Sequence, residues 1–148
     1  MIESKIIHCK AIGAYIYIWI SKQCQVAYVG QTHAKAGVVT RAAQHVRPNG
    51  TFRARLEDIG IDWDTINDWR ILTYELPSKQ EFLSLESSYR LAVEYLVQIR
   101  LYQIQAKINP KLRIVSKVTY TVHAKKQSII NIADEIIVQF IEKYNGLK

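Results

Sequence analysis

Residues 13–30 read GAYIYIWISKQCQVAYVG, and they predict two strands with a turn between them. Aromatic and β-branched side chains fill residues 13–20, which is typical of a strand. The polar segment SKQCQ follows, and residues 26–30 (VAYVG) predict a second strand. Because the connection is short, we expect the two strands to form an antiparallel hairpin. Tyr15 and Tyr17 fall on one face of the first strand, because side chains alternate with a period of two.

The segments that follow the hairpin predict helices and a third strand. Residues 38–46 favour a helix that the turn cluster Arg47-Pro48-Asn49-Gly50 ends. A second short helix is predicted over residues 52–58. Residues 69–76 (WRILTYEL) alternate in part and predict the third strand.

A long helix is predicted to start at Ser78, because Ser78-Lys79-Gln80-Glu81 matches a capping box. Apolar residues then recur at spacings of three and four, and the helix is expected to reach about Gln105, before the break at Asn109-Pro110. The apolar face comprises Phe82, Leu85, Tyr89, Ala92, Leu96 and Ile99. Residues 114–122 predict a strand, and residues 127–144 an amphipathic helix.

Together these patterns predict one α+β domain over residues 1–148, with a small three-stranded antiparallel sheet flanked by helices. Its core is expected over about 13–110, and a C-terminal strand and helix extension over about 111–148. The chain has a formal net charge of +7, which favours a polyanionic partner such as DNA. The cysteines Cys9 and Cys24 fit neither a zinc pattern nor a disulfide framework. The apolar run 11–20 is about half the length of a membrane span, so we expect a cytoplasmic protein with no membrane segment.

Three groups of residues could carry chemistry on a phosphodiester. Arg41 and His45 are four residues apart on a predicted helix and share a face, although a solvated basic face is the simpler interpretation. Glu94 could merely pair with Arg90, but Glu86 is better placed for that pair and leaves Glu94 for another role. Tyr15 and Tyr28 lie in the two hairpin strands, where packing is the simpler interpretation of a tyrosine.

In chain order, these residues resemble the motifs of the GIY-YIG nuclease family. Gly13-Ala14-Tyr15 is similar to the first motif, with Ala14 in place of the usual Ile, and Tyr28-Val29-Gly30 is similar to the second. Arg41 with His45 resembles the helix motif, Glu94 the metal-binding glutamate, and Asn109 the last motif asparagine. The resemblance spans about Gly13 to Asn109.

The resemblance implies a DNA endonuclease with one divalent ion, Mg²⁺ or Mn²⁺, held by Glu94. It implies that Tyr15 orients the attacking water or accepts its proton, and that Tyr28 lines the same pocket. Arg41 would stabilise the phosphorane, His45 would assist near the scissile phosphate, and Asn109 would brace the site. Tyr17 is an alternative to Tyr15 as the first active tyrosine. The expected DNA contacts are Arg41, His45, Arg47, Arg53 and Lys111.

Two other functions stay open from the sequence. One is a DNA-binding module that keeps the fold without turnover. The other is a partner-binding protein whose long helix, residues 78–105, mediates oligomerisation, since Val93, Val97, Leu101 and Ile104 add a second apolar face. We expect that helix to pack centrally, and a homodimer contact stays open.

Overall fold

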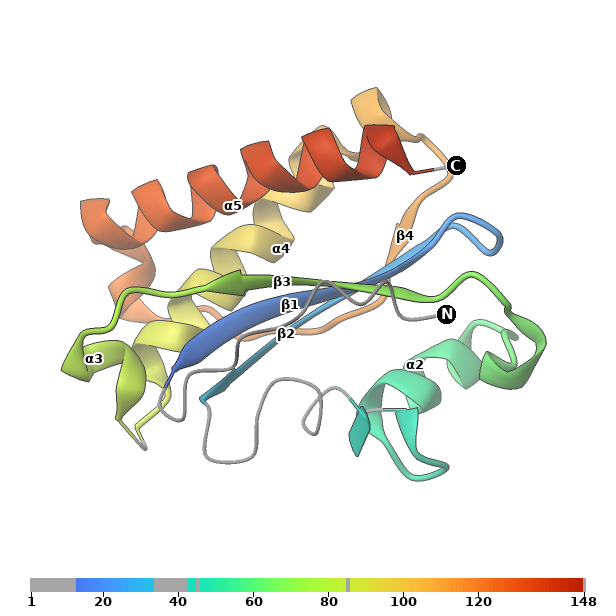
Figure 1. The fold of residues 1–148 in the computed structure, drawn as a ribbon, viewed down its shortest axis with the longest axis horizontal. Coiled ribbons are helices and arrows are strands. Elements are labelled where there is room, and N and C mark those ends of the chain that lie inside the picture. The colour runs from blue at the N-terminus through green and yellow to red at the C-terminus, as the bar shows by residue number, and fades with distance from the viewer. Residues whose placement is uncertain (1–12, 34–42, 45, 85, 148) are drawn as a thin grey trace.

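The computed structural model describes residues 13–33, 43–44, 46–84 and 86–147. They form an α+β arrangement in which a four-stranded sheet lies between two helical layers (Figure 1). The strand order is β3-β1-β2-β4. The strands are β1 (Ala14–Ser21), β2 (Val26–His33), β3 (Arg70–Glu75) and β4 (Arg113–Ile114).

The helices lie on both sides of this sheet. The long helices α4 (Ser88–Ile108) and α5 (Gln127–Gly146) cover one face, and α2 (Thr51–Asp58) lies on the other side (Figure 1). Three shorter elements complete the chain order: the 3-10 helices η1 (Trp63–Thr65) and η2 (Val122–Lys125), and the single-turn helix α3 (Gln80–Leu83).

The predicted hairpin is confirmed, and its turn is held by one carboxylate. β1 and β2 are antiparallel, with Ser21 opposite Val26 across a four-residue connection in which Gln25 has a positive φ of 57°. Asp68 accepts hydrogen bonds from the Ser21 hydroxyl (2.5 Å) and from the backbone N–H groups of Lys22 and Gln23 (2.8 Å each). These bonds satisfy turn donors that no strand partner can reach, so they fix the register of the hairpin.

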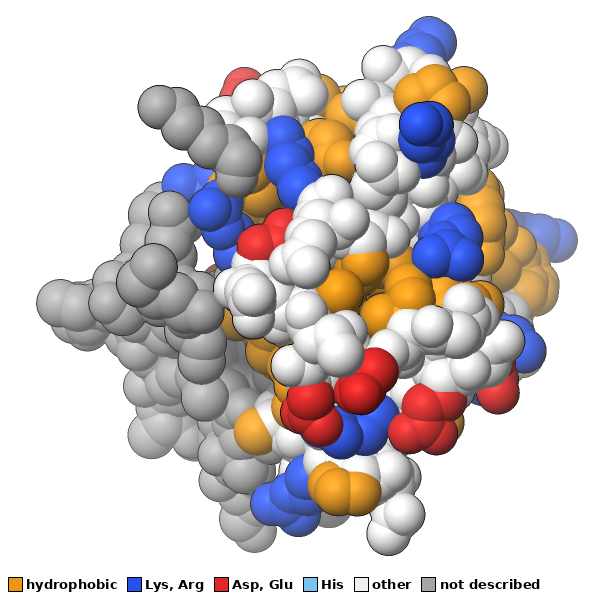
Figure 2. All heavy atoms as spheres, turned by 90° about the vertical axis from the view of Figure 1, so that its right-hand side faces the viewer, with side chains coloured by type: hydrophobic (Ala, Val, Ile, Leu, Met, Phe, Trp, Pro, Cys, Tyr) orange, Lys and Arg blue, Asp and Glu red, His pale blue; other side chains and the backbone are white. Residues whose placement is uncertain are grey.

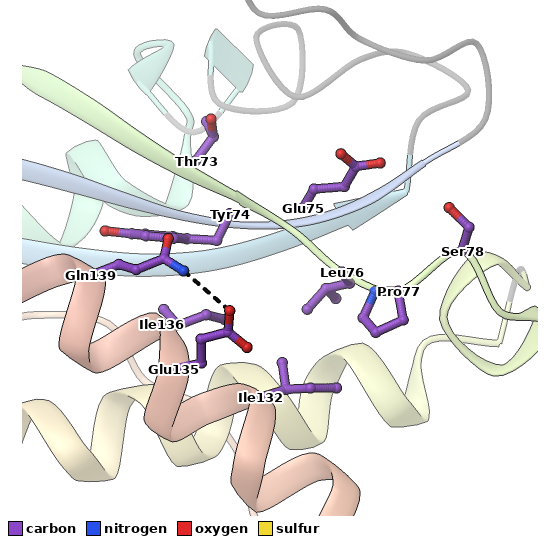
Figure 3. A pocket seen from close by; sticks show the side chains of 10 residues that line it. All are labelled: Thr73, Tyr74, Glu75, Leu76, Pro77, Ser78, Ile132, Glu135, Ile136 and Gln139. Atoms are coloured by element: carbon purple, nitrogen blue, oxygen red, sulfur yellow. Dashed lines mark hydrogen bonds between the residues drawn. The ribbon is translucent and has the colours of Figure 1, made fainter.

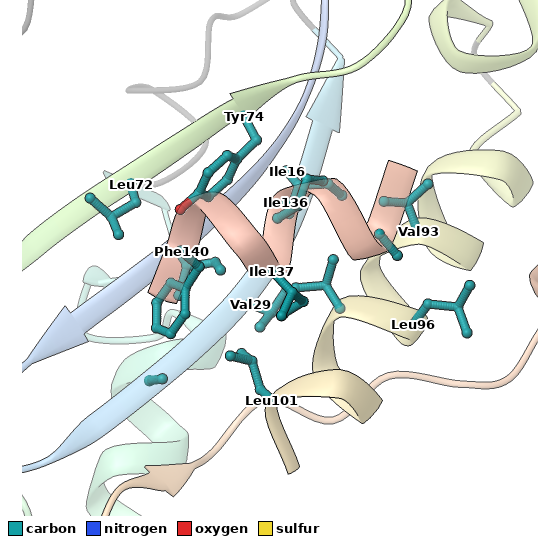
Figure 4. Packing of buried hydrophobic residues seen from close by; sticks show 14 of the residues in the cluster. Ile16, Val29, Leu72, Tyr74, Val93, Leu96, Leu101, Ile136, Ile137 and Phe140 are labelled. Atoms are coloured by element: carbon teal, nitrogen blue, oxygen red, sulfur yellow. The ribbon is translucent and has the colours of Figure 1, made fainter. Parts of the chain in front are cut away.

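One face of the sheet forms an aliphatic core with α4 and α5. Ile16, Ile18 and Ile20 of β1 point into it, and each is at most 1% exposed. From α4, Val93, Val97 and Leu101 pack against this face, and from α5, Ile136, Ile137 and Phe140 do so (Figure 4). The apolar side of the long helix that carries Val93, Val97 and Leu101 is therefore covered by the sheet and α5. This agrees with the expectation that the helix packs centrally in the domain.

The opposite face carries an aromatic core. Tyr15, Tyr17 and Trp19 of β1 share it with Phe52 and Leu56 of α2. Stacked rings of Trp63 and Trp69, 4.5 Å apart and 9° from parallel, close this cluster beside the third strand. Each face of β1 thus has its own helical cover.

The three antiparallel strands predicted for the sheet are confirmed, but the sheet has a fourth strand that the prediction did not include. β3 pairs antiparallel with β1, at the position predicted for residues 69–76. β4 adds to β2 in parallel, through Val26 with Arg113 and Ala27 with Ile114. The strand predicted over 114–122 is therefore wrong beyond Ile114, because the chain leaves the sheet there and crosses to α4, where the Tyr120 ring packs on Tyr95.

The long helix predicted from Ser78 to Gln105 is divided in two. α3 ends at Leu83, and Ser84 is extended (φ −65°, ψ 158°) before α4 begins at Ser88. The capping box is wrong, since Lys79 precedes α3 and no side-chain cap bond forms. Arg90 explains the break: its guanidinium binds the carbonyls of Phe82 and Ser84 at 2.7 and 2.6 Å, so these oxygens are taken from any continuous helix. The helices predicted over 52–58 and 127–144 are confirmed as α2 and α5.

Gly30 provides a test of this packing. A Cβ on Gly30 would overlap the ring end of Tyr17, which is fully buried and cannot swing away. We predict that Gly30→Ala lowers the free energy of unfolding by about 1–3 kcal/mol, as overpacking does. Thermal unfolding followed by circular dichroism would show this as a loss of roughly 2–4 °C per kcal/mol.

Gly146→Ala is the matched control, because a Cβ there meets nothing within 4 Å. Its melting temperature should match that of the unsubstituted protein. Equal melting temperatures for both glycine variants would contradict the close approach of Tyr17 to Gly30.

Candidate functional site

The two candidate tyrosines of β1 point in different directions. Tyr17 is opposite Gly30 in the ladder, and its Cζ and Oη lie over Gly30, where a side chain would otherwise stand. The ring of Tyr15 lies instead over Gly13, with Oη 2.9 Å from the position of a Cβ. Only Tyr17 therefore extends across β2, and it does so because Gly30 leaves room.

Tyr28 lies on the same sheet face, against α2. Its ring stacks on Phe52, with centroids 4.5 Å apart and planes 21° from parallel. It is 6% exposed, and Tyr15 and Tyr17 are 4% and 0% exposed. All three tyrosines thus belong to the aromatic core, and their rings are held by packing.

Glu94 is buried on α4, at 9% exposure. It lies one helical turn after Arg90 on the same side of α4, since residues four apart share a face. Arg90 reaches β2 from that side, where its Nε donates to Oε1 of Gln31 at 2.8 Å. Glu94 therefore lies on the side of α4 that borders β2, and not on a side turned to bulk water.

The outer edge of β2 is the border between the two faces of the sheet beside Gly30 and Gln31. β4 pairs with Val26 and Ala27 only. Along the part of the chain that the structure describes, no strand pairs with the outer edge of β2 from Tyr28 to His33. The tyrosines and α4 lie on opposite faces, so this edge is where groups from the two faces can meet.

Arg90 is a buried cation that positions this part of α4. Its three hydrogen bonds go to Gln31 and to the carbonyls of Phe82 and Ser84. Burial lowers the pKa of its guanidinium. The expected pairing with Glu86 is wrong, because Glu86 accepts instead from Ser88 at 3.2 Å.

Four further predicted site residues are Arg41, His45, Arg47 and Arg53. Arg41 and His45 lie outside the described residues, as does most of the helix predicted over 38–46. Arg47 is exposed. Arg53 binds the Asp64 carboxylate through both terminal nitrogens (3.1 and 3.2 Å), so it ties α2 to η1 and is less available to DNA than predicted.

Asn109 braces the fold at a distance from Glu94. Its Nδ2 donates to the Tyr144 hydroxyl at 3.0 Å, and its Oδ1 accepts from the Lys111 backbone at 3.0 Å. Fifteen residues separate Asn109 from Glu94, which at about 1.5 Å per helical residue is roughly 20 Å. Asn109 therefore joins the end of α4 to α5.

The pairing register of β1 with β2 is a signal that the sequence contains and that the motif comparison did not use. A hairpin that turns over residues 22–25 places Tyr17 opposite Gly30. The resemblance had matched Tyr15 to the first motif, whereas the ladder favours Tyr17.

The donor set fits a hard divalent ion with few protein ligands. The described residues contain no group of three or more His, Cys, Asp or Glu that could hold a metal. A single carboxylate with water and phosphate oxygens is the arrangement that Mg²⁺ prefers. Glu94 can supply that carboxylate.

Over the described residues, no helix is long and apolar enough to cross a membrane.

A separate groove lies between β3 and α5 (Figure 3), with a volume of about 440 Å³. Tyr74, Leu76 and Ile136 line it, and Gln139 hydrogen-bonds Glu135 at its rim (3.4 Å). The Tyr74 hydroxyl is buried and has no hydrogen-bond partner among the described residues. This groove lies on the α5 side of the sheet, away from the face that carries Tyr15, Tyr17 and Tyr28.

Comparison of the chain with protein-family models, with curated proteins and with solved structures gives no match.

Tyr74 gives a prediction about alkaline stability. Burial raises the pKa of its hydroxyl above the ordinary value of 10. The unfolded chain therefore ionises this group first, so its contribution to stability is complete below pH 10 and declines as the pH rises further. We predict that Tyr74→Phe is neutral or slightly stabilising at pH 7 and unfolds less readily than the unsubstituted protein above pH 10.

Urea unfolding at pH 7 and at pH 10.5 would measure both effects. Tyr120→Phe is the control, because Tyr120 is 48% exposed. A Tyr74→Phe protein that loses as much stability between the two pH values as the control would refute the prediction.

Proposed function

We propose that this protein is a metal-dependent endonuclease of the GIY-YIG type that hydrolyses phosphodiester bonds in DNA. The observation that carries the proposal is the passage of the Tyr17 ring over Gly30 towards the outer edge of β2. The side of α4 that holds buried Glu94 borders the same strand. A hydroxyl and a carboxylate from opposite sheet faces could thus serve one phosphate at this edge.

The order of the elements also supports the proposal. Three antiparallel strands, β3-β1-β2, and a long helix after the third strand are the arrangement that the resemblance predicts. The parallel strand β4 is an addition to it. The net charge of +7 favours a polyanionic substrate.

In the proposed reaction, water attacks the phosphorus and the ester bond to the leaving oxygen breaks. Tyr17 orients the water, and Tyr28 forms the wall beneath it. Glu94 holds the divalent ion, which when bound would stabilise charge on the phosphate and on the leaving oxygen. Arg41 is proposed to stabilise the same charge bidentately, with His45 beside it.

The first test concerns the carboxylate. We predict that the unsubstituted protein nicks supercoiled plasmid with Mg²⁺ or Mn²⁺, and that Glu94→Gln reduces the rate by at least about 10³-fold, because loss of the ion removes its electrostatic stabilisation. Arg41→Ala is expected to have a similar effect. Agarose gels of time courses would measure the rates.

Glu142→Gln is the control, because Glu142 is an exposed acid on α5. Full cleavage by a folded Glu94→Gln protein would remove Glu94 from the metal site. Binding of plasmid by the unsubstituted protein without metal-dependent nicking would instead support the non-catalytic DNA-binding module.

The second test separates the two tyrosines of β1. We predict that Tyr17→Phe lowers the nicking rate by at least about 10²-fold, while Tyr15→Phe retains activity within a few fold, because only Tyr17 extends over β2. Each substitution removes a single oxygen from a ring that stays buried. Equal losses in the two variants, or a larger loss in Tyr15→Phe, would return the role to Tyr15.

A further inference from the structure

We propose that residues 111–126, together with the adjoining side of α4, form a second DNA-contact surface that binds the phosphate backbone away from the cleavage site. We call residues 111–126 the strap. The proposal rests on the proposed nuclease function for its choice of DNA as the polyanion. It adds a means of holding the duplex that involves none of the residues proposed for cleavage.

The charge of the chain is concentrated in this region. From Tyr95 to Ala133 the sequence contains seven Lys and Arg residues and no Asp or Glu, so this stretch alone carries the net charge of the whole chain, +7. Arg100 is paired with Asp134 at 2.9 Å. The other six are exposed: Lys107, Lys111, Arg113, Lys117, Lys125 and Lys126.

Several contacts fix the strap to α4, among them a hydrogen bond from the Gln105 side chain to the Leu112 carbonyl and one from Lys126 Nζ to the Tyr89 hydroxyl. The Tyr102 hydroxyl donates to the Ile114 carbonyl at 3.2 Å. The Tyr95 and Tyr120 rings meet edge to face at 5.4 Å, and Tyr89 stacks on His123 at 4.3 Å.

These contacts show that the strap runs antiparallel to α4. Its anchors advance along the strap while their partners recede along the helix, from Tyr102 to Tyr89. Thirteen helical residues span roughly 20 Å. Duplex DNA carries one charge per roughly 1.7 Å, so several phosphates fit along this length. Cations on a fixed support lose less side-chain entropy on binding than cations on a flexible tail.

Charge elsewhere on the surface favours DNA on this side. Lys and Arg side chains are spread over the whole of the face in Figure 2, whereas most of its Asp and Glu gather towards the lower edge. Exposed acids lie on and after α2, at Glu57, Asp58, Asp62 and Asp64. Among the described residues, the exposed large apolar side chains of the strap and of α4 are Tyr102, Tyr120 and Val122, at 47%, 48% and 68%. Three such side chains on a region with six exposed cations do not make the broad apolar face that membrane binding needs.

The test compares two double variants with equal loss of charge. Lys111→Ala/Lys117→Ala removes two exposed strap cations, and Lys79→Ala/Lys143→Ala removes two exposed cations outside it. Binding to a fluorescent 30-base-pair duplex is measured by anisotropy over a range of NaCl concentrations, with a chelator present so that no cleavage occurs. Each lost phosphate contact lowers the salt slope by about 0.9, so the strap variant should lose up to about 1.8 in slope and at least about fivefold in affinity at 0.1 M salt.

The control variant should keep a slope close to that of the unsubstituted protein. Identical slopes and affinities for the two variants would overturn the proposal, as would binding to anionic phosphatidylglycerol vesicles without binding to duplex DNA. Strap-dependent binding by a protein that never nicks would support the strap and reject the nuclease. Metal-dependent nicking with strap-independent binding would do the reverse.

Discussion

The burial of β1 on both faces is the constraint on which the other elements depend. All eight residues from Ala14 to Ser21 are buried. Alternation divides them into an aliphatic set and an aromatic set, and each buried large side chain contributes roughly 1.5–3 kcal/mol only if its face is covered. One helical layer therefore has to lie on each side, which α4 with α5 and α2 with η1 provide. The tyrosines on the aromatic face are enclosed as a result, and the edge of β2 is a place where such a hydroxyl can meet a substrate.

The shortness of β4 keeps that edge available. A parallel strand paired along the whole of β2 would occupy its outer edge from Tyr28 to His33, where groups from the two faces of the sheet can meet. β4 stops after Ile114, because the chain then turns to α4 and its tyrosines. The same turn brings the strap and its cations beside α4. A single change of direction after Ile114 thus leaves the outer edge of β2 without a strand neighbour beyond Ala27 over the described residues, and it lays a basic segment on the helix that carries Glu94.

The sequence predicted correctly the helices and strands whose formation depends on residues within the same segment. The hairpin, β3, α2 and α5 follow from side-chain alternation, turn residues and amphipathic spacing within each segment. The break before α4 does not, because it depends on a buried Arg90 that binds carbonyls six and eight residues earlier. The end of the strand at Ile114 depends likewise on Tyr95 and Tyr102, which no pattern within 114–122 contains. The choice between Tyr15 and Tyr17 required the register with Gly30, which is a property of two strands and not of one.

Arg90 also shows how a structural residue can determine the geometry of a candidate site. A helix turns by about 100° per residue, so a small rotation of α4 would direct the residue at position 94 into the aliphatic core or away from the sheet. Arg90 prevents this rotation, because its hydrogen bonds tie one turn of α4 both to Gln31 of β2 and to the segment before the helix. Burying a guanidinium on neutral acceptors costs free energy that an apolar side chain at this position would not. The cost is consistent with a requirement for orientation: four residues later on the same side, Glu94 lies towards β2, whose outer edge has no strand neighbour beyond Ala27 over the described residues.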